Sequence, residues 1–253
     1  MQITSKLKYL NLGCGLRFHP DWTNIDFSSS SEHVISHNLL NGIPFADNSF
    51  EVIYHSHVLE HFSKDKAKSF IDECYRALQS GGIIRIAVPD LEQITRLYLE
   101  KLEAVQNGEK QAEPDYEWML LELFDQTVRN HPGGHMGELM SRNDLPNAEF
   151  INKRMGKEFS QTQNREGQLE KATLKKKLGK LKRNFQDQMN KVLIKNRYYN
   201  YFHIGKFRMG GEIHQWMYDQ YSLKKLLSSC SFKDPQVKTA SESGIPHWAE
   251  CNL

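Results

Sequence analysis

Two short segments near the start of the chain carry residues that are suited to holding a ribose. An apolar run ends at Gly13, Cys14 and Gly15, and a second run, residues 22–25, ends on Asp26. Glycines lack the Cβ atoms that would keep backbone N–H groups away from a ligand, and a carboxylate accepts hydrogen bonds from two hydroxyls. Ligands of open α/β sheets lie beyond the carboxyl ends of the strands. The glycine turn and the acid at the end of the next run therefore predict a site for a ribose-bearing cofactor.

A second polar group, His57, Glu60 and His61, follows a later apolar run. Histidine titrates near neutrality and can remove a proton from a hydroxyl, and the two histidines share one face if residues 56–62 are helical. Surface or helix-capping roles are equally open for these histidines and for His214. The segment lacks the glutamate that directly follows the first histidine in zinc-protease helices, and no third ligand is evident, so no metal is predicted.

The elements that must position these residues follow from hydrophobic periodicity. Apolar runs predict strands at residues 34–35, 51–54 and 83–88, and apolar residues three and four apart predict a helix over residues 64–79. Gly81 and Gly82 are expected to stop that helix. Strands that alternate with helices at this spacing predict a doubly wound, mainly parallel α/β sheet with helices on both faces.

The middle of the chain, residues 91–211, shows no convincing strand and is predicted to be a mostly helical insertion. The core would then comprise residues 1–90 and 212–253. Further elements are expected as helices at residues 91–105, 116–128 and 221–229 and as strands at residues 236–239 and 248–253.

Within the insertion, residues 171–195 have leucines at helical spacing with lysines between them, which predicts a basic amphipathic helix. Three interpretations are open. The lysines can form a solvated helix face, they can contact an anionic membrane surface, or they can contact nucleic acid.

Composition narrows the class of protein. The chain has 253 residues and a formal net charge of +2, which does not by itself indicate a polyanionic partner. Its four cysteines lack C-x-x-C spacing, so neither a zinc site nor a disulfide framework is predicted, and a reducing cytoplasm is expected. No signal-peptide pattern and no apolar span of membrane length are evident.

Several motifs are similar, in order and spacing, to those of one enzyme family. LNLGCG (residues 10–15), ID (25–26), IPF with DNSFEVI (43–53) and HVLEH (57–61) resemble class I S-adenosylmethionine-dependent methyltransferases of the type 11 group. The resemblance implies a Rossmann-like sheet of the seven-stranded type. Because only ten residues separate Gly15 from Asp26, the first helix of that fold must be very short here.

The resemblance also implies roles for individual residues. Gly13, Cys14 and Gly15 would lie against the methionine and ribose portions of S-adenosylmethionine, and Asp26 would hold the ribose hydroxyls.

Three further positions correspond to cofactor contacts in that family. Asn38 stands where the family usually has an acid near the adenine amino group, and Leu39 would pack on the adenine ring. His55 would approach the methionine part through its backbone. An amide in place of the acid keeps a donor and an acceptor but loses the charge.

These observations predict transfer of the methyl group of S-adenosylmethionine to a hydroxyl of a small-molecule or saccharide-type acceptor. Catalysis would come mostly from positioning, with His57 or His61 as the base and the helical insertion as lid and acceptor region. The saccharide class rests on the association of similar proteins with surface polysaccharides. Two alternatives remain, a catalytically inactive cofactor-binding scaffold or regulator and an RNA methyltransferase that uses the basic insertion.

Overall fold

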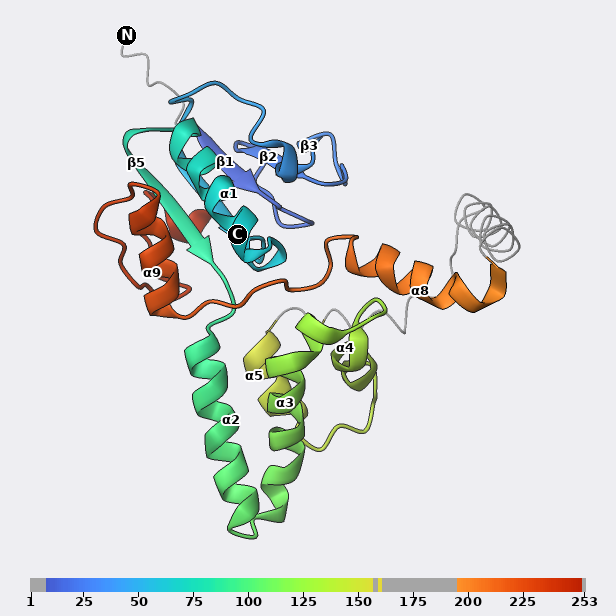
Figure 1. Cartoon of the computed structure of the whole chain (residues 1–253). Coiled ribbons are helices and arrows are strands. Elements are labelled where there is room, and N and C mark those ends of the chain that lie inside the picture. Colours follow the sequence, from blue (N-terminus) through green and yellow to red (C-terminus); the bar gives the residue numbers. More distant parts are fainter. Residues whose placement is uncertain (1–7, 157–158, 161–194, 252–253) are drawn as a thin grey trace. The chain divides into compact units, whose positions relative to one another are not determined.

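The computed structural model describes residues 8–156, 159–160 and 195–251, and the chain divides into two compact units (Figure 1). Unit 1 comprises Met1–Glu92 and His214–Leu253, and unit 2 comprises Gln93–Ile213. The sequence placed these boundaries at residues 90/91 and 211/212. The basic helix expected at residues 171–195 lies, except for its last residue, outside the described residues.

Unit 1 is built on a parallel sheet of five strands in the order β3-β2-β1-β4-β5. The strands are β1 (Tyr9–Leu12), β2 (Thr23–Asp26), β3 (Val34–Ser36), β4 (Phe50–Ser56) and β5 (Leu78–Ala87). Leu12 lies opposite Ile25 on one side and His55 on the other. The carboxyl ends of β1, β2 and β4 therefore meet at one edge of the sheet.

Alternation along the strands gives the sheet two apolar faces. One face packs against α1 (Lys64–Ala77) and α9 (Gln220–Ser229), both visible beside the sheet in Figure 1. The other face, including Tyr54, packs against Trp22 and Ile245. Among the described residues this second face is covered by a loop and by the C-terminal segment, which includes a short 3-10 helix.

The expected sheet of the seven-stranded type is corrected to five strands in the described part of the chain. Residues 236–239 form no strand, and Val237 among them is exposed rather than packed against the sheet. Trp248–Glu250 forms a short 3-10 helix, η5, instead of a final strand. Its Trp248 ring packs on Tyr54 and under the guanidinium of Arg85, so the residue covers the sheet rather than extending it.

The glycine pair after α1 was also misinterpreted. The helix ends at Ala77, and Gly81 and Gly82 lie inside β5 rather than before it. Gly81 has φ +78°, a left-handed conformation, and the pairing of β5 with β4 shifts register between Phe50 and Val52. The glycines thus form a bulge in a longer strand, a use of glycine that its local sequence does not distinguish from a helix stop.

The other described elements are helices. They are η1 (Leu39–Asn41), η2 (Leu59–His61), α2 (Leu91–Gln106), η3 (Lys110–Ala112), α3 (Glu113–Val128), α4 (Gly134–Met140), α5 (Ala148–Met155) and α8 (Lys195–Arg208). Unit 2 has its own core, in which Trp118, Met136 and Ile151 are buried. None of the described helices has the length and apolar character that a membrane span requires.

Candidate functional site

The turn after β1 requires glycine. Gly13 and Gly15 have φ +63° and +55°, which L-amino acids with a side chain rarely adopt. A Cβ atom on Gly13 would overlap Cγ2 of Val58, so the turn and the segment after β4 are in close contact. The bare backbone of this turn lies where a cofactor of the fold would bind.

Asp26, at the end of β2, is held against the same turn. Its Oδ2 accepts a hydrogen bond of 2.9 Å from the Gly15 N–H, and its Oδ1 accepts one of 3.2 Å from Ser28. The Cys14 N–H donates to the Ile25 carbonyl at 3.1 Å, which ties the two strand ends together. Each carboxylate oxygen retains a lone pair that can accept a further hydrogen bond from a hydroxyl.

No helix forms between the turn and β2 in the described residues, so the prediction of a very short helix there was wrong. Two buried asparagines hold this loop instead. Asn11 Nδ2 donates to the Arg17 carbonyl at 3.1 Å, and Asn24 Nδ2 donates to the carbonyls of His19 and Trp22, each at 2.9 Å. Amides within strands carry no motif of their own, so neither asparagine is recognisable from the sequence alone.

The next strand end carries Asn38 and Leu39. Asn38 caps η1, with its Oδ1 accepting from the Leu40 N–H at 3.0 Å. Leu39 packs against the core, whereas Leu40 is 66% exposed. Phe27, the residue after Asp26, is 74% exposed. Leu40 and Phe27 therefore offer apolar surface beyond the ends of neighbouring strands, and neither was singled out from the sequence.

Two of the expected cofactor contacts have buried side chains. His55 is fully buried against the Phe70 ring, and burial lowers its pKa to about 4, so the ring is neutral at pH 7. Burial, together with the Asp26 charge, raises the pKa of the Cys14 thiol to about 11. Neither side chain is therefore suited to act as an acid, base or nucleophile at neutral pH.

The segment after β4 is not the single helix that would place His57 and His61 on one face. His57 has φ +55°, and only Leu59–His61 forms a turn of helix, η2. His57 nevertheless places its Nδ1 3.2 Å from Glu60 Oε1. The His57 side chain is 66% exposed, whereas Glu60 has no exposed surface.

Glu60 is the buried charge of this group. Burial raises the pKa of its carboxyl, but His57, the local backbone and His61 together outweigh burial, so the pKa is lowered and the carboxylate is charged at neutral pH. Neither oxygen accepts a hydrogen bond of acceptable geometry among the described residues. Nearby, burial and then the Glu60 charge raise the pKa of Tyr218 to about 12.

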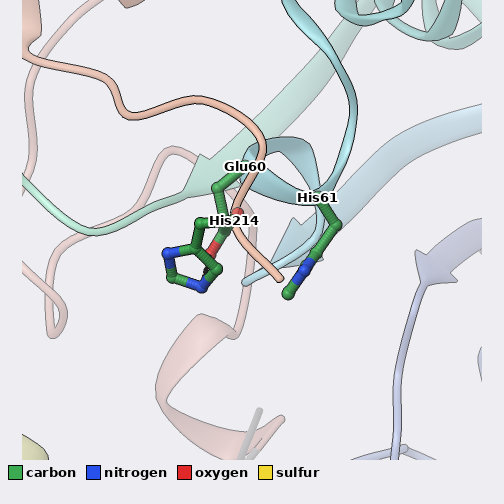
Figure 2. Close-up of side chains that lie close together, drawn as sticks. All are labelled: Glu60, His61 and His214. Atoms are coloured by element: carbon green, nitrogen blue, oxygen red, sulfur yellow. Dashed lines mark ion pairs between the residues drawn. The ribbon is translucent and has the colours of Figure 1, made fainter. Parts of the chain in front are cut away.

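His214 joins the group from the far end of the sequence, as Figure 2 shows. Its Nε2 lies 4.0 Å from Glu60 Oε1, and its ring meets that of His61 edge to face with centroids 4.9 Å apart. The segment is fixed by hydrogen bonds to the Glu60 carbonyl from the N–H groups of Gln215 and Trp216, at 2.7 and 3.2 Å. Nothing in the sequence pairs His214 with Glu60, because the pairing depends on the fold.

Two small hollows, of about 210 and 160 Å³, lie elsewhere in unit 1. Both are lined by Tyr9 and Pro246, the first with the start of β5 and the second with Trp22. They include neither the glycine turn nor Asp26. We assign no cofactor to them, because ligands of parallel sheets bind at the opposite, carboxyl ends of the strands.

Comparison with known proteins gives one family match. Residues 21–86, which run from just before β2 into β5, match the family model described as a methyltransferase domain. No curated protein matches the chain. Taken with the parallel sheet, the match over residues 21–86 supports a class I S-adenosylmethionine-dependent methyltransferase of the type 11 family.

Proposed function

We propose that unit 1 binds S-adenosylmethionine beyond the ends of β1, β2 and β3 and passes its methyl group to a hydroxyl of a small-molecule or saccharide-type acceptor. The observation that carries the binding site is the Asp26 carboxylate, held across the glycine turn by the Gly15 and Ser28 N–H groups. A carboxylate held in this way can accept hydrogen bonds from both ribose hydroxyls without changing its position.

The exposed apolar side chains suggest where the adenine would lie. Phe27 directly follows β2 and Leu40 lies within η1, and both are exposed, so a flat heterocycle bound beyond these strand ends would find apolar surface there. Asn38, whose Oδ1 already caps η1, would use its amide N–H groups toward the ring. We therefore propose Leu40 as an adenine contact beside the Leu39 position that the family resemblance implies.

For the proton of the acceptor hydroxyl, the geometry favours His57 over His61. His57 is the more exposed, and the proximity of its Nδ1 to Glu60 favours the tautomer in which Nε2 carries the lone pair. Methyl transfer itself relieves the positive charge of the sulfonium, so alignment of the acceptor oxygen with the methyl supplies most of the catalysis.

The acceptor class is carried over from the family resemblance, and two alternatives make different predictions. A scaffold that has lost catalysis would bind the cofactor and methylate nothing. An RNA methyltransferase would bind mixed RNA with a steep salt dependence. The basic segment at residues 171–195 is the proposed contact for an anionic membrane surface or, in the RNA alternative, for phosphates.

The test is a methyl-transfer assay with labelled S-adenosylmethionine on size-fractionated cell extract. We expect label in the small-molecule or saccharide fraction, and we expect a strong loss of that label in His57→Ala with cofactor affinity retained. His33→Ala, at an exposed histidine outside the group of His57, Glu60 and His61, is the matched control. Cofactor binding without any labelled product would favour the scaffold, and label in the RNA fraction would overturn the proposed acceptor class.

A further inference from the structure

We propose that Glu60, His61 and His214 bind a divalent transition-metal ion. Each offers one ligand atom, and these atoms all lie within 4.8 Å of one another. Figure 2 shows Glu60 and His61 on the short helix η2 and His214 on a separate segment that approaches it. The sequence alone predicts no metal, because it shows no third ligand, and the fold supplies one in His214.

The burial of Glu60 is an independent observation that points to a cation. Its carboxylate has no exposed surface, and neither oxygen accepts a hydrogen bond of acceptable geometry in the described part of the chain. A buried carboxylate without such partners is costly, because it has lost its hydration shell. An ion coordinated by this carboxylate would compensate for that loss more completely than the His57 side chain at 3.2 Å does.

The chemistry of the ligands selects the class of metal. Two imidazoles and one carboxylate suit Zn²⁺, Mn²⁺, Fe²⁺ or Co²⁺, whereas Mg²⁺ and Ca²⁺ prefer sites made of oxygen alone. Ligand atoms about 2.1 Å from an ion in tetrahedral geometry are about 3.4 Å apart. Glu60 Oε1 and His214 Nε2 are 4.0 Å apart, and all three ligand atoms lie within 4.8 Å of one another, so movements of about 1 Å would complete the coordination.

Backbone contacts hold the third ligand in place. Gln215 and Trp216 donate to the Glu60 carbonyl, and the Gln215 side chain donates to the His61 carbonyl at 3.0 Å. The segment of His214 is thus attached to the two residues that carry the other ligands. Supporting bonds of this kind keep metal ligands oriented before the ion binds.

The place of the site suggests what the ion does, and this part rests on the proposed function. Val58, between His57 and η2, lies against Gly13 of the cofactor turn. Three protein ligands leave a coordination position open, which an acceptor oxygen can occupy. The oxygen would lose its proton to His57 or water and form the new O–CH₃ bond while the S–CH₃ bond breaks, leaving a neutral thioether.

The test uses the full chain stripped of metal with a chelator. Co²⁺ is titrated and followed by its visible absorption, and Zn²⁺ and Ca²⁺ are compared by their effect on thermal unfolding. We expect one equivalent of Co²⁺, a rise in melting temperature with Zn²⁺ but not Ca²⁺, and affinity lower by roughly tenfold or more in His61→Ala and His214→Ala. His33→Ala, at an exposed histidine outside the site, should bind as the wild type does.

Absence of saturable binding by the wild type, or equal binding by all four proteins, would overturn the metal site. If His214→Ala does not fold, the wild-type titration and His61→Ala decide the question. Calorimetry of the stripped protein with S-adenosylmethionine separates the two proposals. If the stripped wild-type protein binds the cofactor but takes up no metal, the metal site is refuted and the proposed function still stands.

Discussion

At the scale of single residues, Gly13 shows how little space the cofactor turn leaves. Its positive φ and the proximity of Val58 are two separate reasons for glycine, whereas Gly15 has the positive φ alone, with no atom near the position of a Cβ. The two glycines therefore allow steric overlap to be measured apart from backbone strain.

We predict that Gly13→Ala lowers the free energy of unfolding by roughly 2–4 kcal/mol, from left-handed strain plus overlap with Val58. Gly15→Ala should cost only the strain, about 1–2 kcal/mol. Urea unfolding of the full chain measures both. Equal losses would show that Val58 moves aside without cost, and adding Val58→Ala to the Gly13 variant should recover the steric part.

Single residues also show which parts of the site can be predicted from the sequence. Gly13, Gly15 and Asp26 were found because a glycine turn and an acid after a strand are local patterns. His214 could not be assigned, since its proximity to Glu60 arises only when distant segments fold together. Asn24 escaped notice for a related reason, because its hydrogen bonds to the loop depend on the loop's path.

At the scale of elements, α1 fixes the loop that leads into β4. Arg76 donates to the carbonyls of Ile43 and Phe45 and to the Asp47 carboxylate, at 2.8–2.9 Å. Glu73 accepts from Arg76 and from the Ile43 N–H. The helix thus holds a segment rich in turn formers in position beside the sheet.

This network predicts a pH dependence of stability. Hydrogen bonding by Arg76 lowers the pKa of Glu73 from 4.5 to about 2. A carboxyl whose pKa is depressed in the folded state stabilises the fold above its unfolded pKa, and this contribution is lost as the pH falls from about 4.5 to about 2. Because the Glu73 side chain is one-third exposed, we expect about 1–2 kcal/mol at pH 7.

Denaturant unfolding of the wild type and Glu73→Gln from pH 7 to pH 2.5 checks this. The stability difference between the two proteins should shrink on acidification. Glu32→Gln, at a largely exposed carboxylate, should follow the wild type at every pH. A difference that stays constant with pH would mean that Glu73 acts through packing rather than charge.

Elements were predicted well where hydrophobic periodicity was strong. The runs that became β1, β2 and β4 are buried on both faces, and α1, α2, α3 and α9 lie close to their expected positions. The C-terminal strands were wrong, because short apolar runs such as that around Trp248 are equally compatible with a segment lying over a sheet. The Gly81 bulge was missed since glycine ends helices and interrupts strands alike.

At the scale of the whole molecule, every residue of the proposed cofactor and metal sites belongs to unit 1, although His214 lies beyond unit 2 in the sequence. The chain returns from Gln93–Ile213 to the sheet at the point where His214, Gln215 and Trp216 attach to η2. The site therefore needs both parts of unit 1, and it is complete only after the second part has joined the sheet.

The central claim is that the Asp26 carboxylate holds the ribose of S-adenosylmethionine beside the glycine turn. Calorimetry with S-adenosylhomocysteine on the wild type, Asp26→Ala and the control Asp72→Ala tests it most directly, Asp72 being an acid of α1 paired with Lys68. We predict that Asp26→Ala weakens binding by about 1.5–3 kcal/mol, roughly tenfold to 150-fold, and that Asp72→Ala binds as the wild type does. A folded Asp26→Ala protein with unchanged affinity would contradict the account.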